Sequence, residues 1–415
     1  MTIRAFNALR PKDPKQAGEI AALPYDVMNS EEAKAAVEGK PWSFLHVDKA
    51  EIDLPPETDP HDDEVYAKAK ENLQKMIDQE IYMREKKPTL YIYQLEANGR
   101  TQTGVAACVS VEEYKQGIIK RHELTRPDKE LDRIKHIKAT EAHTGPIFMA
   151  YRDNGMASAP KNLMDAWIKI FPPLYDFKAE DGVSHRLWPI DANTVRDGFI
   201  KAFDAIDCIY IADGHHRNEA ASKAADPANE ESQYYLAVIF PHDELAILEY
   251  NRVVKDLNGH DKNAFIAALK NVASVEESAT PVQPANKYEM GLYMAGQWYK
   301  LNFPTPSEAD IIKTLDVSVL QDKVLAPLLG INDPREDSRI DFVGGIRGLT
   351  ELERRVNSGE MAVAFSMYPT SMEELMAVAD AGQIMPPKST WFEPKLRSGL
   401  LIHSTLKGEE TNEED

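Results

Sequence analysis

The part of the sequence richest in reactive side chains is a run of five residues that follows an apolar stretch: Asp213, Gly214, His215, His216 and Arg217. If a strand ends there and a helix begins, the glycine lets the backbone approach a ligand, and the free N–H groups of the helix start attract an anion. Arg217 adds a planar cation suited to phosphate oxygens, and the histidines can donate hydrogen bonds or move protons near neutral pH. The run predicts a phosphate-binding segment; the alternative is that Asp213 caps the helix and the histidines lie at the surface.

A second group of polar residues stands upstream and consists of His122, Glu123, Thr125, Asp132, Arg133 and Thr140. The His122-Glu123 pair follows a β-prone stretch and is suited to act as a general base or, through its carboxylate, as a metal ligand. Asp132, Arg133 and Thr140 belong to an expected helix from Lys129 to Ala142. These side chains either border one cleft or form ordinary surface ion pairs.

Three short segments are weaker candidates: Tyr25 with Asp26, Asn251 with Arg252, and Lys388 with Ser389 and Thr390. The first lies on a proline-shaped loop before an expected helix, and an ordinary turn is its alternative. The last combines a rigid Pro-Pro stretch with side chains that can donate to a phosphate; the alternative is a well-packed C-terminal loop. Asn251 and Arg252 end a β-prone run and are a candidate anion contact; the alternative is an arginine that is solvated or salt-bridged.

The elements that must position these residues alternate between strands and helices, which predicts an α/β fold, with mixed α+β as the alternative. Ser43–Val47, Leu90–Gln94 and Cys208–Ala212 are expected strands, and 62–79 is an expected amphipathic helix. Tyr234–Phe240 and Leu245–Val254 are expected to pair as a hairpin. We expect a catalytic lobe over residues 1–255, a smaller α+β lobe over 256–415, and an acidic tail after about residue 406.

Composition narrows the classes of function. The net charge of −20 argues against a nucleic-acid partner, because duplex binding relies on Lys and Arg to neutralise phosphates. The two cysteines show no paired spacing, so neither a disulfide framework nor a thiolate metal site is expected. No apolar run reaches membrane-spanning length and no signal peptide begins the chain, so we expect a cytoplasmic protein without a membrane partner.

The ordered motifs PYDV, HE-x-T, DR, ADGHHR and MPPKSTWFEPK-x-x-SG resemble a prokaryotic family, the domain-of-unknown-function family 1015, from about Phe6 to Ile402. More distantly, G-H-H-R-x-x-A-A is similar to the phosphate-binding box of the ParB/sulfiredoxin superfamily, which includes nucleotide-hydrolysing partition proteins, sulfiredoxins and free-serine kinases. That similarity implies a ParB/sulfiredoxin-like core, a mixed sheet flanked by helices, in which residues 214–217 contact nucleotide phosphates. Sulfiredoxins carry their catalytic cysteine where this chain has His215, so sulfinic acid repair is not expected.

These observations lead to an expected function: phosphoryl transfer or phosphoester hydrolysis on a small metabolite, with Mg²⁺ and a nucleotide (ATP, ADP or CTP) as cofactors. The resemblance to family 1015, whose genes tend to lie near serine-biosynthesis genes, suggests serine or phosphoserine as the substrate. Arg217 and the amides after Gly214 would bind phosphate, His215 or His216 would act as hydrogen-bond donor or acid, and Glu123 with Asp213 would act as base or Mg²⁺ ligand. The main alternative is a nucleotide or phosphometabolite sensor that acts through a protein partner; a purely structural interaction protein is the third reading.

Overall fold

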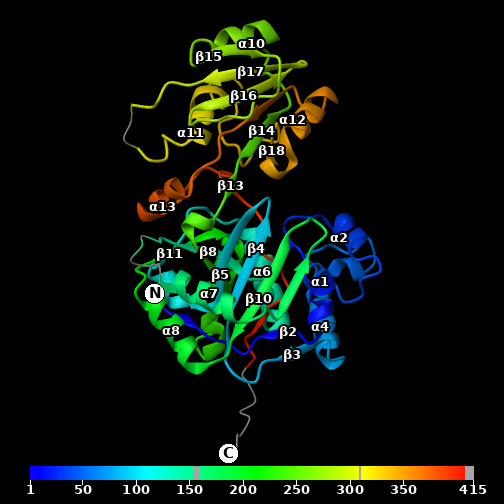
Figure 1. The fold of residues 1–415 in the computed structure, drawn as a ribbon. Helices are drawn as coiled ribbons and strands as arrows, with labels where there is room; N and C mark the ends of the chain where they lie inside the picture. The colour runs from blue at the N-terminus through cyan, green and yellow to red at the C-terminus, as the bar shows by residue number, and fades with distance from the viewer. Residues whose placement is uncertain (154, 156–158, 308–309, 407–415) are drawn as a thin grey trace, which may run out of the picture. The chain divides into compact units, whose positions relative to one another are not determined.

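The computed structural model describes residues 1–153, 155, 159–307 and 310–406, and divides the chain into two compact units (Figure 1). Unit 1 comprises Met1–Lys120, Thr125–Leu245 and Pro394–Asp415, and unit 2 comprises Arg121–Leu124 and Ala246–Glu393. The sequence predicted a division near residues 255 and 256. In the structure the main segment of unit 2 begins at Ala246, and the chain returns to unit 1 at Pro394. The predicted acidic tail lies outside the described residues.

Unit 1 is built on a mixed sheet with strand order β6-β11-β8-β12-β5-β4-β10-β9, and β1 pairs with β5. The strands are β1 (Ile3–Arg4), β4 (Leu90–Ala97), β5 (Arg100–Ser110), β6 (Ile119–Lys120), β8 (Ile147–Tyr151), β9 (Tyr175–Lys178), β10 (Ser184–Ile190), β11 (Ile209–Asp213) and β12 (Tyr234–Pro241). Parallel pairing joins β11 to β6 and β12 to β8, whereas the other neighbours are antiparallel. The expected α/β class is therefore confirmed as a large mixed sheet flanked by helices.

The helices of unit 1 are α1 (Ala17–Ile20), α2 (Ser30–Ala36), α3 (Leu45–Asp48), α4 (Asp63–Asp78), α5 (Val111–Lys115), α6 (Pro127–Thr140), α7 (Ala159–Ile170), α8 (Asn193–Asp204) and α9 (His215–Ala224). One core packs α7 and α8 against the sheet through Met164, Phe199 and Phe203. Another gathers α3 and α4 around Phe44 and Leu73. These apolar contacts hold α7 and α8 on the sheet and hold α3 and α4 together.

The C-terminal segment after Pro394 is tied into unit 1. Short ladders join β2 (Leu9–Pro11) to β3 (Tyr82–Arg84) and β7 (Ala142–His143) to β21 (His403–Ser404). Single bridges connect Ala22 with Ser398 and Leu9 with Ile402. The segment thus brings residues from the far end of the sequence to the loops that surround α6 and α9.

Unit 2 holds an antiparallel sheet with strand order β15-β17-β16-β19-β14-β18. Its elements are β13 (Ile247–Leu248), β14 (Tyr250–Val254), α10 (Lys262–Leu269), β15 (Ser274–Ser278), β16 (Glu289–Met294), β17 (Gln297–Asn302), α11 (Asp316–Leu320), β18 (Ile340–Gly344), α12 (Gly348–Asn357), β19 (Val363–Ser366), α13 (Met372–Asp380) and β20 (Trp391–Phe392). Apolar side chains of α10 and α11 pack on one face of the sheet and those of α12 on the other. Unit 2 therefore has a core of its own.

Two predictions about elements were wrong. Ser43–Val47, expected as a strand, lies at and within helix α3, because a five-residue segment is too short for its pattern of apolar residues to separate helix from strand. The expected hairpin of Tyr234–Phe240 with Leu245–Val254 does not form: β12 belongs to the sheet of unit 1 and β14 to the sheet of unit 2. The two runs are close in the sequence, which suggested a hairpin, but each of them pairs with strands of a different unit.

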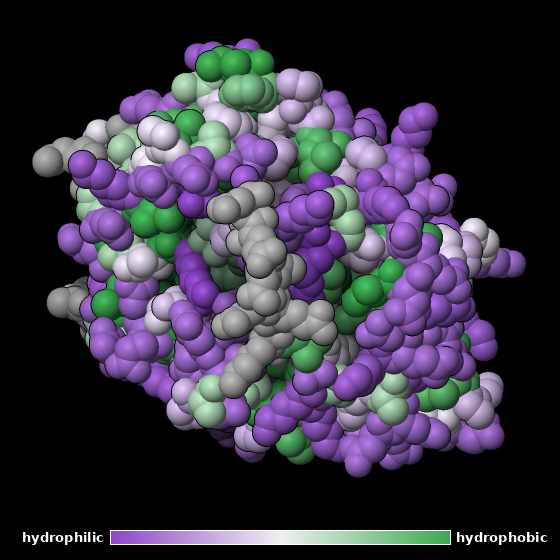
Figure 2. Space-filling view, turned by 90° about the horizontal axis from the view of Figure 1, so that it is seen from below, coloured by the Kyte–Doolittle hydropathy of each residue, from purple (hydrophilic) through white to green (hydrophobic). Residues whose placement is uncertain are grey.

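Polar side chains dominate the face of the molecule in Figure 2, with hydrophobic residues in scattered groups, in keeping with the excess of charged residues in the sequence.

None of the helices within the described residues has both the length and the apolar character required to cross a bilayer.

Candidate functional site

The 213–217 segment adopts the expected strand, glycine and helix arrangement. β11 ends at Asp213 after a register shift against β8, and such an irregularity re-aims the side chains at a strand end. Gly214 has φ of 94°, a conformation that glycine adopts without steric cost, and α9 starts at the next residue. No side chain caps this helix among the described residues. The first-turn N–H groups of α9 thus follow the general rule that a helix start is an anion-attracting end.

Arg217 folds back over the glycine loop. Its Nη1 donates to the carbonyl oxygen of Pro146 at 2.7 Å, and a Cβ placed on Gly214 would lie 3.1 Å from Nη2. Its Nε is buried and has no hydrogen-bond partner within the described part of the chain. A buried guanidinium donor that is left unbonded costs free energy, so this position is suited to a ligand acceptor.

Asp213 is held by Lys395, which comes from the C-terminal segment, through an ion pair of 3.1 Å. Burial alone raises the pKa of this carboxyl group, but the charges of Lys395, Arg217 and His215 lower it well below its ordinary value. The group is therefore ionised at neutral pH. It is a poor proton acceptor and a good anchor for cations.

The two histidines have different surroundings. His215 is buried at the first position of α9. His216 is half-buried, and its Nε2 accepts a hydrogen bond from the backbone N–H of Arg126 at 3.1 Å. That bond requires an unprotonated Nε2, so His216 supports the segment before α6 in its neutral form.

Helix α6 presents a second arginine. Arg133 donates from Nε to Asp132 at 2.7 Å, and its guanidinium carbon lies 3.8 Å from the ring centroid of Tyr25. Asp132 also accepts from Tyr66 at 2.9 Å and pairs with His61 at 3.1 Å. These partners hold Arg133 in one position and leave its terminal nitrogens without a partner among the described residues.

Arg133 and Arg217 line one pocket of unit 1 that is open to solvent. Its polar lining consists of Tyr25, Asp48, Arg133, His136, His143, Thr144, Arg217 and Ser398. Burial lowers the pKa of His136 and lowers the pKa of His143 to about 3, so neither imidazole is charged at neutral pH. The positive charge of the pocket wall therefore comes from the two arginines.

Several lining residues were not anticipated from sequence. Asp48 lies on α3, accepts a hydrogen bond from Thr144 Oγ1 at 2.7 Å and stands 4.0 Å from His136 Nε2. Ser398 arrives with the C-terminal segment, and a Cβ on Gly145 would lie 2.7 Å from its hydroxyl oxygen. Asp48 directly follows the segment Ser43–Val47 that was expected as a strand. Ser398 lies in the MPPKSTWFEPK-x-x-SG motif, which the sequence alone does not link to α6.

Other sequence candidates of unit 1 lie outside the pocket lining. Thr140 donates its hydroxyl to the carbonyl oxygen of His136 at 2.8 Å, within its own helix. Thr125 donates to Glu130, which also pairs with Lys223. Asp26 is exposed beside Tyr25. Thr140 and Thr125 are therefore engaged in structural hydrogen bonds. Asp26 affects Tyr25 through its charge, which adds to the effect of burial in raising the pKa of Tyr25.

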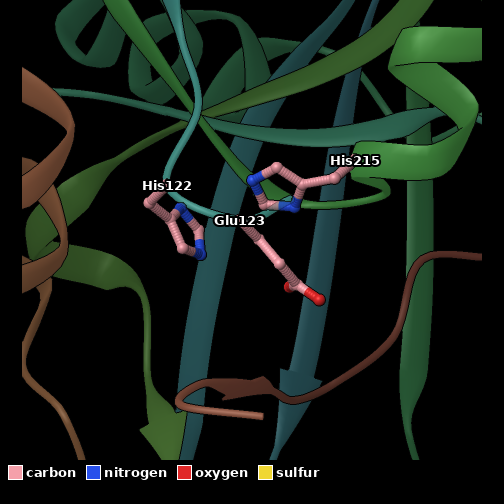
Figure 3. A group of neighbouring side chains, drawn as sticks. All are labelled: His122, Glu123 and His215. Atoms are coloured by element: carbon pink, nitrogen blue, oxygen red, sulfur yellow. The ribbon is translucent and has the colours of Figure 1, made fainter. Parts of the chain in front are cut away.

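The remaining sequence candidates belong to unit 2. Figure 3 shows His215 at the start of α9, and His122 and Glu123 on the segment that follows β6; these two belong to unit 2 and His215 to unit 1. The carbonyl oxygen of His122 accepts from the backbone N–H of Met385 at 2.8 Å. Asn251, Arg252, Lys388, Ser389 and Thr390 also lie in unit 2. A cleft shared by these residues and Arg217 stays a prediction.

Mg²⁺ favours oxygen ligands and is usually held by one or two carboxylates together with substrate phosphates. Asp213 offers a carboxylate at the start of α9, but Lys395 already occupies one of its oxygens. Asp48 offers the carboxylate of the pocket lining, and Thr144 donates to it. The chemistry of these donors fits Mg²⁺ only if the ligand's own phosphates supply further oxygens.

The fold and the pocket define an α/β protein with an arginine-lined pocket beside a glycine-initiated helix. Residues 3–318 match the family model described as "Protein of unknown function (DUF1015)", and the chain belongs to this family. A search of curated proteins finds no match.

Solved structures with a similar arrangement include a free serine kinase in complex with AMP, at 13% identity and a TM-score of 0.37, covering 71% of this chain and 91% of that one. SbnI from Staphylococcus aureus, with a C-terminal truncation, is 12% identical with a TM-score of 0.39, and covers 74% of this chain and 90% of its own. A conserved hypothetical protein from Pyrococcus furiosus is 16% identical with a TM-score of 0.34, at 71% and 95% coverage.

Proposed function

We propose that the protein binds a small phosphorylated ligand or nucleotide in the pocket of unit 1 and catalyses phosphoryl transfer or phosphoester hydrolysis on it. The observation that carries the proposal is the pair of arginines in one pocket beside the uncapped start of α9. Phosphoryl transfer depends mainly on positioned donors that stabilise charge on the phosphoryl oxygens. Arg217, Arg133 and the first-turn amides of α9 are such donors.

The proposal gives each side chain a different task. Arg217 and the amides after Gly214 bind phosphate, and Arg133, held in place by Asp132 and Tyr25, binds a second anionic group of the same ligand. Asp213 keeps Lys395 beside the 213–217 segment as a further cation. His215 is the candidate acid or hydrogen-bond donor, because His216 is engaged through Nε2. Glu123 retains its predicted role as base or Mg²⁺ ligand.

The pocket chemistry also bears on the substrate. Two guanidinium groups suit phosphate and carboxylate groups, whereas the buried carboxylate of Asp48 suits an ammonium group. A small molecule that carries both charges, such as serine or phosphoserine, meets this requirement. Mg²⁺ and ATP, ADP or CTP complete the proposal as cofactors.

The test is a thermal-shift panel of ATP, ADP, CTP, phosphoserine, serine with nucleotide, and inorganic phosphate, each with and without Mg²⁺. A ligand that binds the native state raises the melting temperature according to its occupancy. Wild type, Arg217→Ala and the control Arg186→Ala are compared; Arg186 lies on β10 and pairs with Glu96 and Asp176, away from the pocket lining. We expect a shift that survives in Arg186→Ala and disappears in Arg217→Ala.

The outcome also separates kinds of activity. A nucleotide shift that requires Arg217 indicates a kinase or nucleotide sensor, and a phosphoserine shift without a nucleotide response indicates a phosphatase. A shift that is equal in wild type and Arg217→Ala contradicts the proposed site.

A sensor is the second candidate, and it is favoured by one observation: Asp213 is ionised and ion-paired, and thus unsuited to accept a proton. Binding of a panel ligand with no turnover of any phosphoryl donor or ester, measured by phosphate release and by ³¹P NMR, would support the sensor. Turnover of one ligand that depends on Arg217 would establish the enzyme.

A further inference from the structure

Arg252 on β14 is a buried cation without an acidic partner. Its side chain donates to the carbonyl oxygens of Tyr250 and, at 3.1 Å, of Lys388, and the residue is 3% exposed. It forms no ion pair with any described residue. Burial lowers the pKa of its guanidinium to about 10, which reflects the cost of holding this charge out of water.

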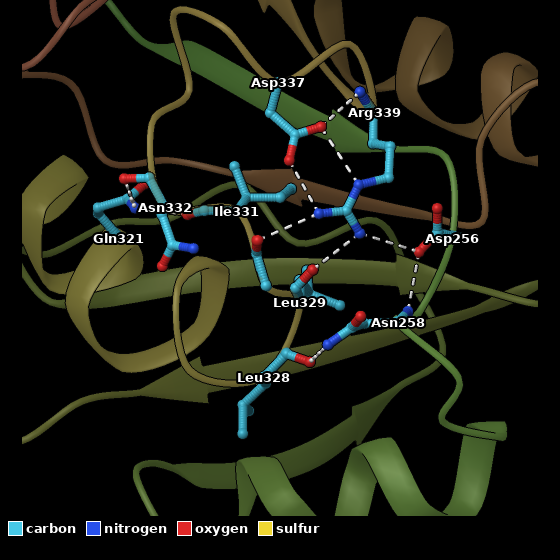
Figure 4. Close-up of polar contacts among 10 residues, drawn as sticks. Asp256, Asn258, Gln321, Leu328, Leu329, Ile331, Asn332, Asp337 and Arg339 are labelled. Atoms are coloured by element: carbon cyan, nitrogen blue, oxygen red, sulfur yellow. Dashed lines mark hydrogen bonds and ion pairs between the residues drawn. The ribbon is translucent and has the colours of Figure 1, made fainter.

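Two other arginines of unit 2, the partly exposed Arg339 and the buried Arg355, are paired with carboxylates. Arg339 pairs with Asp337 at 2.8 Å and Asp256 at 3.3 Å while it donates to the carbonyl oxygens of Leu329 and Gly330 (Figure 4). Arg355 on α12 pairs with Asp341 and Glu360. Arg252, like Arg339, donates to backbone carbonyl oxygens, but no carboxylate pairs with it within the described residues. Its positive charge is therefore available to another partner.

Lys388 places a second cation next to Tyr250. Its Nζ lies 5.5 Å from the ring centroid of Tyr250, the residue whose carbonyl oxygen accepts from Arg252. The side chain is exposed and makes no ion pair with the described residues, although acidic residues outnumber basic ones in this chain by 68 to 48. Trp391 packs edge-on against Tyr250 at 5.2 Å and so borders the same group.

The turn that carries Lys388 is held in an unusual backbone conformation. Lys388 has φ of 56°, a left-handed value that costs a non-glycine residue free energy. Ser389 donates to the carbonyl oxygen of Pro386 at 2.6 Å, and Thr370 donates to that of Ser389 at 3.0 Å. These bonds, together with the one from Arg252, fix the turn and keep the two cations beside Tyr250.

We propose that Arg252 and Lys388 form an anion-binding site within unit 2 that takes a phosphoryl group. A planar carboxylate pairs best with a guanidinium whose two parallel N–H groups are both available. In Arg252, Nη1 and Nη2 already donate to two carbonyl oxygens, which disfavours a carboxylate ligand. The several oxygens of a phosphate can accept from a partly used guanidinium and from an ammonium that approaches from another direction. This site does not depend on the pocket of unit 1.

The test titrates the full-length Arg217→Ala protein with inorganic phosphate at constant ionic strength and follows tryptophan fluorescence. Acetate serves as the carboxylate comparison, and Trp391→Phe assigns the signal to the residue beside Tyr250. Because removal of a charge-assisted hydrogen bond weakens binding by about tenfold or more, we expect Lys388→Gln to raise the Kd for phosphate by at least that factor. Arg252→Lys keeps the charge but loses the guanidinium geometry, so we expect it to raise the Kd as well. The matched control Lys270→Gln, at an exposed lysine of unit 2, should leave the Kd unchanged.

A saturable response that weakens in both variants and is stronger for phosphate than for acetate supports the site. No saturable response, equal binding of acetate, or an unchanged Kd in Lys388→Gln overturns it. If Arg252→Lys fails to fold, Lys388→Gln decides the matter, because its side chain is exposed. Since Arg217 is absent throughout, failure here is distinguishable from failure of the pocket in unit 1.

Discussion

Arg133 and Arg217 line the same pocket, yet the protein treats their charges differently. On α6, Arg133 is neutralised by Asp132, and Tyr25 packs against its guanidinium. At the start of α9, Arg217 donates to one carbonyl oxygen and keeps a buried Nε without a partner in the described chain. The difference indicates that Arg133 is held in place before a ligand binds, whereas the charge of Arg217 is available to a ligand.

The largest effect is expected when the ion pair between Asp132 and Arg133 on α6 is removed. In Asp132→Asn, the buried Arg133 loses its counter-charge, and an uncompensated buried charge costs roughly 3–5 kcal/mol of unfolding free energy. Urea denaturation measures the loss. Asp128→Asn, whose partner Arg126 is exposed, is the control and should change stability by less than about 1 kcal/mol. Equal effects of the two substitutions would show that Arg133 does not need Asp132.

The same pair gives a pH dependence. Burial alone raises the pKa of Asp132, but the charge of Arg133 and hydrogen bonds from Arg133, Tyr66 and His61 lower it to about 2. Its unfolded pKa is about 3.9. A carboxyl group with a depressed folded-state pKa stabilises the fold above its unfolded pKa, and this stabilisation disappears as the pH falls toward the folded value.

Wild type should therefore lose about 2 kcal/mol between roughly pH 5 and pH 2 that Asp132→Asn does not lose. Urea titrations of both proteins across this range measure the difference. Parallel pH profiles would mean that Asp132 titrates alike in the folded and unfolded chains.

The smallest effect is expected at Gly214, directly before α9. Gly214→Ala forces a side chain into φ of 94° and places its Cβ 3.1 Å from Nη2 of Arg217, which should cost about 1–2 kcal/mol and weaken ligand binding because Arg217 must move. Gly117→Ala has a similar φ of 77° with no atom within 4 Å, so it isolates the backbone cost. If both variants bind ligand alike, the contact between Gly214 and Arg217 has no role in binding.

The sequence predicted the β11-to-α9 segment because an apolar strand, a glycine and a helix start are local features. It also named Tyr25, Arg133 and Arg217, which the structure places around one pocket. It missed Asp48, which ends a helix whose preceding residues were expected to form a strand, and Ser398, because its approach depends on bridges between distant segments. Local chemistry is readable from sequence, whereas the partners that complete a pocket are set by tertiary contacts.

The most direct test of the central claim is the affinity of wild type, Arg217→Ala and Arg186→Ala for whichever nucleotide or phosphorylated metabolite most stabilises the wild type, measured by isothermal titration calorimetry. We expect Arg217→Ala to lose on the order of 2–4 kcal/mol of binding free energy or transition-state stabilisation, with a nearly unchanged unfolding free energy and with Arg186→Ala like wild type. Equal affinity and turnover in wild type and Arg217→Ala would contradict a phosphate site at the start of α9.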